Sequence, residues 1–156
     1  YKSITWSECT LRKYLNNEFI NYTFNSNIIK MIKKISLENP DYCITIDEKK
    51  INTKGGPSTE DRVFCLSMDE VKKYFKNNNA EVAKPTDYCL SQVEEDYKKF
   101  FVDNKTGGGS FWLRTPGSLQ NFAIIMKGSG LVNDVGISVD NASVGIRPAL
   151  WLHLES

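Results

Sequence analysis

The clearest fold signal in this sequence is Gly107-Gly108-Gly109-Ser110-Phe111-Trp112-Leu113-Arg114-Thr115-Pro116-Gly117. Its apolar, aromatic-rich run, Phe111–Leu113, is short and bounded by glycine and proline, which is typical of a buried strand. Pro116 should end regular strand pairing, because proline has no backbone N–H to donate. The stretch holds no reactive group, so it indicates a fold rather than a chemistry.

A counterpart stands near the end of the chain, Gly145-Ile146-Arg147-Pro148-Ala149-Leu150-Trp151-Leu152-His153-Leu154. It predicts a second buried strand over Ala149–Leu154. The residues between the two stretches are polar and punctuated by glycine and asparagine, which predicts a β-meander with strands over 122–126 and 131–139. A further central strand is expected at 61–67.

Helix signals occur earlier in the chain. Thr5-Trp6-Ser7-Glu8 and Ser67-Met68-Asp69-Glu70 both have the spacing of a capping box, in which a hydroxyl and a carboxylate satisfy free backbone donors. The first predicts a helix that ends at Asn16-Asn17, and the second a helix to about Phe75. Asn25 or Ser26 should cap another helix, whose apolar face carries Ile28, Ile29, Ile32 and Ile35.

The remaining segments are less regular. Pro85 favours a short helix over 86–93, and residues 94–101 extend it or start a new one. Residues 38–62 are rich in turn residues, and we expect mostly a surface excursion there, with a weak strand or hairpin around Ile44, Ile46 and Ile51.

These elements predict an α+β fold, a small antiparallel sheet meander with flanking short helices, in one domain spanning residues 1–156. One core should bury almost all of the large apolar side chains. We expect it to contain Trp112, Trp151, Leu113, Leu150, Phe64, Leu66, Leu11 and Leu15.

Composition excludes several classes of function. The chain has 20 Lys and Arg against 19 Asp and Glu, a net charge of +1, so no basic stripe indicates nucleic acid binding. Apolar runs fall short of the ~20 residues of a membrane-spanning helix, and membrane insertion is not expected. The chain begins without Met, so we expect it to be a processed or excised piece of a longer protein.

The four cysteines, Cys9, Cys43, Cys65 and Cys89, show no metal-binding spacing with His153. We predict four reduced thiols, no bound metal and no cofactor. Reduced thiols favour the cytoplasm, although a cell-surface location stays open if the longer parent carries a signal peptide.

Four motifs together resemble a bacterial domain family of unassigned function. They are Trp6-Ser7-x-x-x-Leu11-Arg12-x-Tyr14-Leu15-Asn16, Val63-Phe64-x-Leu66-Ser67-x-x-Glu70, Phe111-Trp112-Leu113-Arg114-Thr115-Pro116-Gly117 and Gly145-Ile146-Arg147-Pro148-Ala149-Leu150-Trp151-Leu152. The resemblance implies a C-type-lectin-like fold akin to formylglycine-generating enzyme and retroelement variable proteins. Members usually carry further strands upstream of the Trp6 motif, so this chain is expected to lack the N-terminal strands of the domain.

Several residues invite a chemical role. Arg114 and Arg147 have the fork geometry that clamps anions, but a strand arginine more often pairs with a carboxylate or with backbone carbonyls. We therefore assign a structural frame to Trp6, Arg12, Trp112, Arg114, Arg147 and Trp151. Asn133, Asp134, Asp140 and Asn141 could ligate Ca²⁺, yet their spacing fits turns better. His153 lies on an apolar strand and is expected to be structural.

The sequence favours a non-catalytic binding module for a protein or a glycan, with no catalytic residue. Short polar side chains on the loops of the meander would form the binding surface, because loops on a rigid scaffold commonly bind ligands. These are Ser118, Gln120, Asn121, Asn133, Asp134, Ser138, Asp140, Asn141 and Ser143.

Two alternatives stay open. The first is a degenerate or uncharacterised enzyme of the formylglycine-generating type. The second is an assembly domain completed by a strand from another chain, because without upstream strands the strand at Ile146–Leu154 would leave an open sheet edge. Such an edge predicts either a dimer or an added partner strand.

Overall fold

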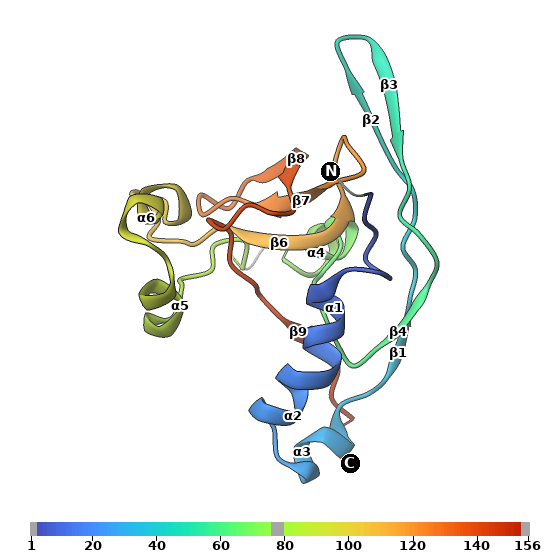
Figure 1. Ribbon diagram of the computed structural model, residues 1–156, viewed down its shortest axis with the longest axis vertical. Helices are drawn as coiled ribbons and strands as arrows, with labels where there is room; N and C mark the ends of the chain where they lie inside the picture. The colour runs from blue at the N-terminus through green and yellow to red at the C-terminus, as the bar shows by residue number, and fades with distance from the viewer. Residues whose placement is uncertain (1–2, 76–79, 154–156) are drawn as a thin grey trace.

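The computed structural model describes residues 3–75 and 80–153, and it combines short helices with small antiparallel sheets (Figure 1). The α+β class expected from the sequence is confirmed. The helices are α1 (Thr10–Tyr14), the π-helix η1 (Leu15–Phe19), α2 (Ile20–Thr23), α3 (Ser26–Met31), α4 (Met68–Tyr74), α5 (Asp87–Gln92) and α6 (Glu95–Phe101). The strands are β1 (Ile35–Leu37), β2 (Tyr42–Ile46), β3 (Lys49–Thr53), β4 (Thr59–Asp61), β5 (Val63–Phe64), β6 (Phe111–Pro116), β7 (Phe122–Met126), β8 (Val132–Ser138) and β9 (Ala149–Leu150).

The predicted meander is present as the three-stranded antiparallel sheet β6-β7-β8. The two other predicted strands, at 61–67 and 149–154, are shorter than expected, since β5 and β9 have two residues each. They pair antiparallel with Val63 opposite Leu150. Beyond β9 the chain continues beside the end of α3, where the backbone N–H of the exposed His153 donates to the Met31 carbonyl at 2.7 Å. Leu154, which we expected to belong to this strand, lies outside the described residues.

The first helix begins later than its sequence signal indicated. Thr5 does not cap a helix, because its hydroxyl bonds to the Ser7 hydroxyl at 2.8 Å and residues 5–8 form a turn. Cys9 is the N-cap of α1, and its sulfur accepts from the backbone N–H of Arg12 at 3.4 Å. The predicted capping box at Thr5 is therefore wrong, and the turn leaves residues 4–9 free to line a pocket.

Asn16-Asn17 does not end this helix, as we had expected. The chain continues as η1 and α2 to Thr23. The Asn16 side chain does not end the helix, because it is directed toward the start of β5. The Asn16 amide donates to the Val63 carbonyl at 2.8 Å and accepts from the N–H groups of Arg62 and Val63. Asn16 thus satisfies the edge of β5 in place of a neighbouring strand.

The other helix starts follow their sequence signals. Ser67 and Glu70 form the predicted capping box of α4, Asn25 caps α3, and Thr86 caps α5. Ile35 is an exception, since it belongs to β1 and not to the apolar face of α3.

The two arginines expected on strands differ in their contacts: Arg114 lies on β6 and pairs with a carboxylate, whereas Arg147 precedes β9 and bonds to a backbone carbonyl. The Arg114 guanidinium binds the Glu70 carboxylate through two nitrogens and also donates to the Cys65 carbonyl at 3.1 Å. Arg147 donates to the Ala80 carbonyl, and its guanidinium carbon lies 4.7 Å and 5.3 Å from the ring centres of Phe75 and Phe111. These contacts join β6 and the residues before β9 to the α4 region.

Residues 38–62 are more regular than a surface excursion. β1 pairs with β4, and β2 pairs with β3, so this part of the chain folds back on itself as a long two-stranded ribbon (Figure 1). The expected hairpin is therefore present but longer. The register could not be predicted from the turn-rich composition, because β1 pairs with β4, which is distant in the sequence.

The buried side chains form two clusters rather than one core. Phe64 and Leu15 belong to a cluster between the N-terminal helices and β5, whereas Leu113 belongs to a second cluster between α4 and the meander. Leu66 packs against both. Trp112 is only half-buried and Trp151 is 46% exposed, so the expectation that both indoles are buried is wrong.

This difference predicts unequal costs of truncation. Leu113 is 2% exposed. Leu113→Ala should therefore lower the free energy of unfolding by about 3 kcal/mol, because it leaves a cavity in a packed cluster. Trp151 contacts the Tyr74 ring with centroids 5.9 Å apart but is half in water, so Trp151→Ala should cost about 1 kcal/mol. Denaturant melts would measure both, and a larger loss for Trp151→Ala would contradict this packing.

The thiols should differ in reactivity. All four cysteines are free; Cys43 is exposed, Cys9 and Cys89 are partly buried, and Cys65 is buried. Burial raises the pKa of Cys65 to about 12 and also raises the pKa of Cys9, so their reactive thiolates are scarce at neutral pH. Iodoacetamide followed by mass spectrometry should label Cys43 first and Cys65 only after unfolding. If Cys65 in the native chain reacted as fast as Cys43, the predicted order of reactivity would be wrong. Fewer than four labels on the denatured, unreduced chain would show that not all four thiols are free.

Candidate functional site

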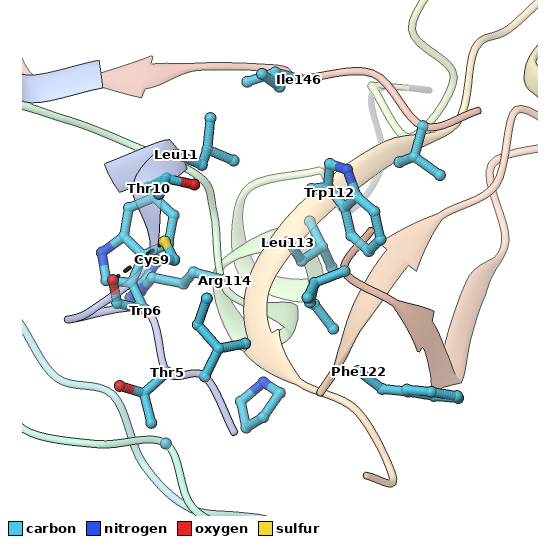
Figure 2. Close-up of a pocket in the computed structure, with 16 residues that line it drawn as sticks. Thr5, Trp6, Cys9, Thr10, Leu11, Trp112, Leu113, Arg114, Phe122 and Ile146 are labelled. Atoms are coloured by element: carbon cyan, nitrogen blue, oxygen red, sulfur yellow. Dashed lines mark hydrogen bonds between the residues drawn. The ribbon is translucent and has the colours of Figure 1, made fainter. Parts of the chain in front are cut away.

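A pocket of about 320 Å³ lies between the N-terminal segment and the meander (Figure 2). We call it the Trp6–Trp112 pocket. The N-terminal segment and α1 contribute Ile4, Thr5, Trp6, Cys9, Thr10 and Leu11. Strands β6 and β7 contribute Trp112, Leu113, Arg114, Pro116, Phe122 and Ala123, and Gly55, Val139, Val144 and Ile146 complete the lining.

The position of Trp112 follows from the alternation of side chains along β6. Phe111 and Leu113 are buried in the cluster with α4, so Trp112 between them projects from the opposite face of the strand. Figure 2 shows its indole on the β6 side of the pocket, across from Trp6 and Cys9. A partly exposed indole beside a cavity offers a large apolar surface at little further cost in side-chain entropy.

Trp6 forms the facing wall and is fixed by a buried carboxylate. Asp61 is fully buried and accepts from Trp6 Nε1 at 3.0 Å, from Arg12 Nε at 2.7 Å and from the Thr59 hydroxyl at 2.8 Å. A buried carboxylate is tolerated when it is paired and fully hydrogen-bonded, as here. The network therefore fixes the indole of Trp6 and ties the N-terminal segment to β4.

The ribbon closes one side of the same wall. Gly56 has a φ of +90°, and a Cβ there would lie 2.8 Å from Thr5 Cβ. Glycine is required by both the backbone conformation and the close approach. The ribbon can thus pass directly against residues 4–5 at the mouth of the pocket.

The polar groups of the pocket are few and mostly engaged. The Cys9 thiol donates to the Trp6 carbonyl at 3.3 Å while its sulfur caps α1. Desolvation by burial is the largest effect on this thiol and raises its pKa, which suits a structural role better than a nucleophilic one. The Arg114 guanidinium forms a bidentate ion pair with Glu70. Its buried Nε has no hydrogen-bond partner among the described residues.

The polar residues proposed as ligands from the sequence lie outside this pocket, in three places. Ser118, Gln120 and Asn121 are in the turn between β6 and β7. The Gln120 amide there bonds to Ile4 O and to both backbone groups of Lys54, at 2.9–3.2 Å, so it joins three segments of the chain. Ser118 is buried, and its N–H donates to the Val135 carbonyl.

Asn133, Asp134 and Ser138 belong to β8. Asp134 is exposed, whereas the Ser138 hydroxyl is buried and has no hydrogen-bond partner in the described part of the chain. Within residues 3–75 and 80–153, no three His, Cys, Asp or Glu side chains gather closely enough to hold a metal ion. Asp134 and Asp140 therefore belong to no such group.

Asp140, Asn141 and Ser143 lie in the loop after β8, beside α6. The Asn141 carboxamide oxygen accepts from both the N–H and the hydroxyl of Ser143, at 2.8 and 2.6 Å, which is the turn chemistry expected from the sequence. Together with Tyr97 and Phe100, this loop borders an open hollow. The hollow is separate from the Trp6–Trp112 pocket, since the two share no lining residue.

The frame residues are divided as well. Trp6, Trp112 and Arg114 line the pocket, whereas Arg147 and Trp151 contact the α4 region. The pocket is not apparent from the sequence, because the sequence predicts a helix start near Thr5 and a buried position for Trp112. The alternation of side chains along β6 could have placed Trp112 correctly. Phe111 and Leu113 form the buried face of the strand, so Trp112 between them must lie on the other face.

No helix within the described residues is long and apolar enough to cross a bilayer. A comparison with curated proteins found no match, and a comparison with solved structures found none either. A scan against protein families matched residues 1–154 to the model described as Domain of unknown function (DUF6273). The four motifs quoted from the sequence all fall inside that match. The chain therefore belongs to the DUF6273 family.

Proposed function

We propose that this domain is a non-catalytic binding module and that the Trp6–Trp112 pocket receives an apolar group of its ligand. The partly exposed indole of Trp112 in a mainly apolar pocket carries this proposal. Apolar and aromatic linings with a small number of polar groups are characteristic of ligand sites. Acid–base or nucleophilic chemistry gains little support, because the pocket's thiol has a raised pKa and Arg114 is paired with Glu70.

The ligand group is an aromatic or branched aliphatic side chain of a protein partner. A cavity of about 320 Å³ accommodates a group of that size, at the lower limit of the ~300–1,000 Å³ typical of small-molecule sites. A glycan would present many hydroxyl groups, and the lining offers chiefly the hydroxyls of Thr5 and Thr10 to meet them. A buried anchor side chain in a pocket is the common centre of protein–protein recognition.

A C-type-lectin-like scaffold is part of this proposal. Its support is the resemblance of the four sequence motifs, together with the antiparallel meander β6-β7-β8 followed by the closing strand β9. On such a scaffold, the polar loops around Asn121 and Asp140 form an outer rim beyond the apolar pocket. They would contact the same partner, because the N–H of Val139, which lines the pocket next to Asp140, donates to the Asn121 carbonyl at 3.0 Å.

Toluene is a suitable probe, since it mimics an aromatic side chain. Titrating it into ¹⁵N-labelled protein should shift the indole N–H signals of Trp112 and Trp6, which line the pocket. The signal of Trp151, which lies against Tyr74, should stay in place and serve as an internal reference. Equal shifts of all three signals, or no shift of any, would argue against the pocket as the binding site.

Two valines provide a matched pair of variants for this experiment. Val139 lines the pocket and is 40% exposed, whereas Val135 is 39% exposed and does not line it. Val139→Phe should fill part of the cavity and weaken toluene binding about tenfold, since ~1.4 kcal/mol of lost contact corresponds to that factor. Val135→Phe should bind like the parent. Equal effects from the two variants would contradict the assignment.

A further inference from the structure

The hairpin formed by β2 and β3 projects from the molecule and packs mainly against itself. Figure 1 shows it extending beyond the remaining elements, and its two strands form a separate two-stranded sheet. Isolated two-stranded hairpins are marginally stable in water, and unpaired edges recruit further strands. The hairpin therefore has two open edges whose backbone groups are suited to an extended chain.

One face of the hairpin carries all three of its isoleucines, with Lys49 at the end next to the turn. Register places Ile44 opposite Ile51 and Ile46 opposite Lys49, so the three isoleucines share a face. Cys43, Thr45, Lys50 and Asn52 lie on the other face. A wider sheet would join the apolar faces of neighbouring hairpins.

The direction of the backbone groups on β3 can be derived from the turn. Asp47 and Glu48 form a two-residue loop, and their φ values of 48° and 64° are those of a type I′ turn. The residues that flank such a loop, Ile46 and Lys49, bond to each other, so Ile51 and Thr53 also face β2. The N–H and C=O of Lys50 and Asn52 therefore point outward.

Gln120 supports this direction independently. Its side-chain amide pairs with the N–H and the C=O of Lys54, the next residue in the outward series, at 3.1 and 2.9 Å. It holds the outward edge of β3 at Lys54, as a neighbouring strand would. The edge left open by the described chain thus consists of Lys50 and Asn52.

We propose that two copies of this chain associate through the outer edge of β3, antiparallel, with the two Ile51 residues opposite each other. Lys50 of each copy then pairs with Asn52 of the other, which uses all of the open outward groups. Beyond the paired residues, where Gln120 already holds the backbone of Lys54, the Glu48 side chain of each copy extends toward the Lys54 ammonium group of the other. That ammonium group binds Asp41 at 2.6 Å within its own chain, so each Lys54 lies between two carboxylates. The two hairpins become one four-stranded sheet, and their isoleucines form a continuous apolar face.

Charge selects this register over its neighbours. If the second copy is shifted by two residues in one direction, Lys50 of one copy lies opposite Lys50 of the other. A shift by two residues in the other direction places Lys50 of one copy opposite Lys54 of the other. Using the outer edge of β2, centred on Ile44, would place Asp41 opposite Asp47. Like charges directly opposite each other destabilise strand pairs, and opposite charges stabilise them.

Sedimentation equilibrium should show a monomer–dimer equilibrium for the parent chain, and Asn52→Pro should abolish the dimer. Proline removes the outward N–H of residue 52 without removing a bond between β2 and β3. Cys43→Pro is the matched control, because residue 43 is the cross-strand neighbour of Asn52 and its N–H also points outward, on β2. A parent that stays monomeric at its highest soluble concentration, or a Cys43→Pro chain that loses the dimer equally, would overturn the proposal.

A charge exchange tests the register itself. Glu48→Lys and Lys54→Glu each create two like-charge pairs in their own homodimer, so each should weaken dimerisation by about tenfold or more. Mixing the two variants restores both opposite-charge pairs, and a heterodimer should form about as tightly as the parent dimer. Circular dichroism melts would check that each variant is folded. Failure of the mixture to associate better than either variant alone would refute this register.

Discussion

The buried carboxylate of Asp61 is the constraint on which the N-terminal half of this structure depends. It accepts hydrogen bonds from Trp6, Arg12 and Thr59, and water does not reach it. Removing one partner from such a charge typically costs about 3–5 kcal/mol, because the remaining charge stays buried. The three donors come from the N-terminal turn, α1 and β4, so one side chain fixes how these elements meet.

The Trp6–Trp112 pocket is a consequence of that constraint. Asp61 holds Trp6 on one wall, while the Arg114–Glu70 pair joins β6 to α4 and thereby holds the strand that carries Trp112. The two walls are anchored separately, so a cavity can persist between them without either indole collapsing into it. Pre-organised apolar pockets bind well because little ordering remains to be done on binding.

Local signals made much of the fold predictable. The capping box of Ser67 and Glu70, the alternation of β6 and the glycine-rich turns of the meander all specify structure through near neighbours. The failures involve partners that are distant in sequence. Asn16 is typical of a helix end in the sequence, but its amide binds the backbone of β5. Trp151 was expected in the core, but its ring packs against Tyr74 and remains 46% exposed. The pocket was missed for the same reason, since it needed both the turn at Thr5 and the outward face of Trp112.

Hydrogen exchange of the three indole N–H groups tests the central claim most directly, in the parent and in Asp61→Asn. The substitution keeps the shape of the side chain, but it turns an acceptor into an amide donor that faces other donors. The account predicts that Trp6 exchanges slowest of the three in the parent, and that Asp61→Asn both removes this protection and weakens the toluene-induced shift of Trp112. Trp6 exchanging as fast as the exposed Trp151 in the parent, or keeping its protection in Asp61→Asn, would contradict it.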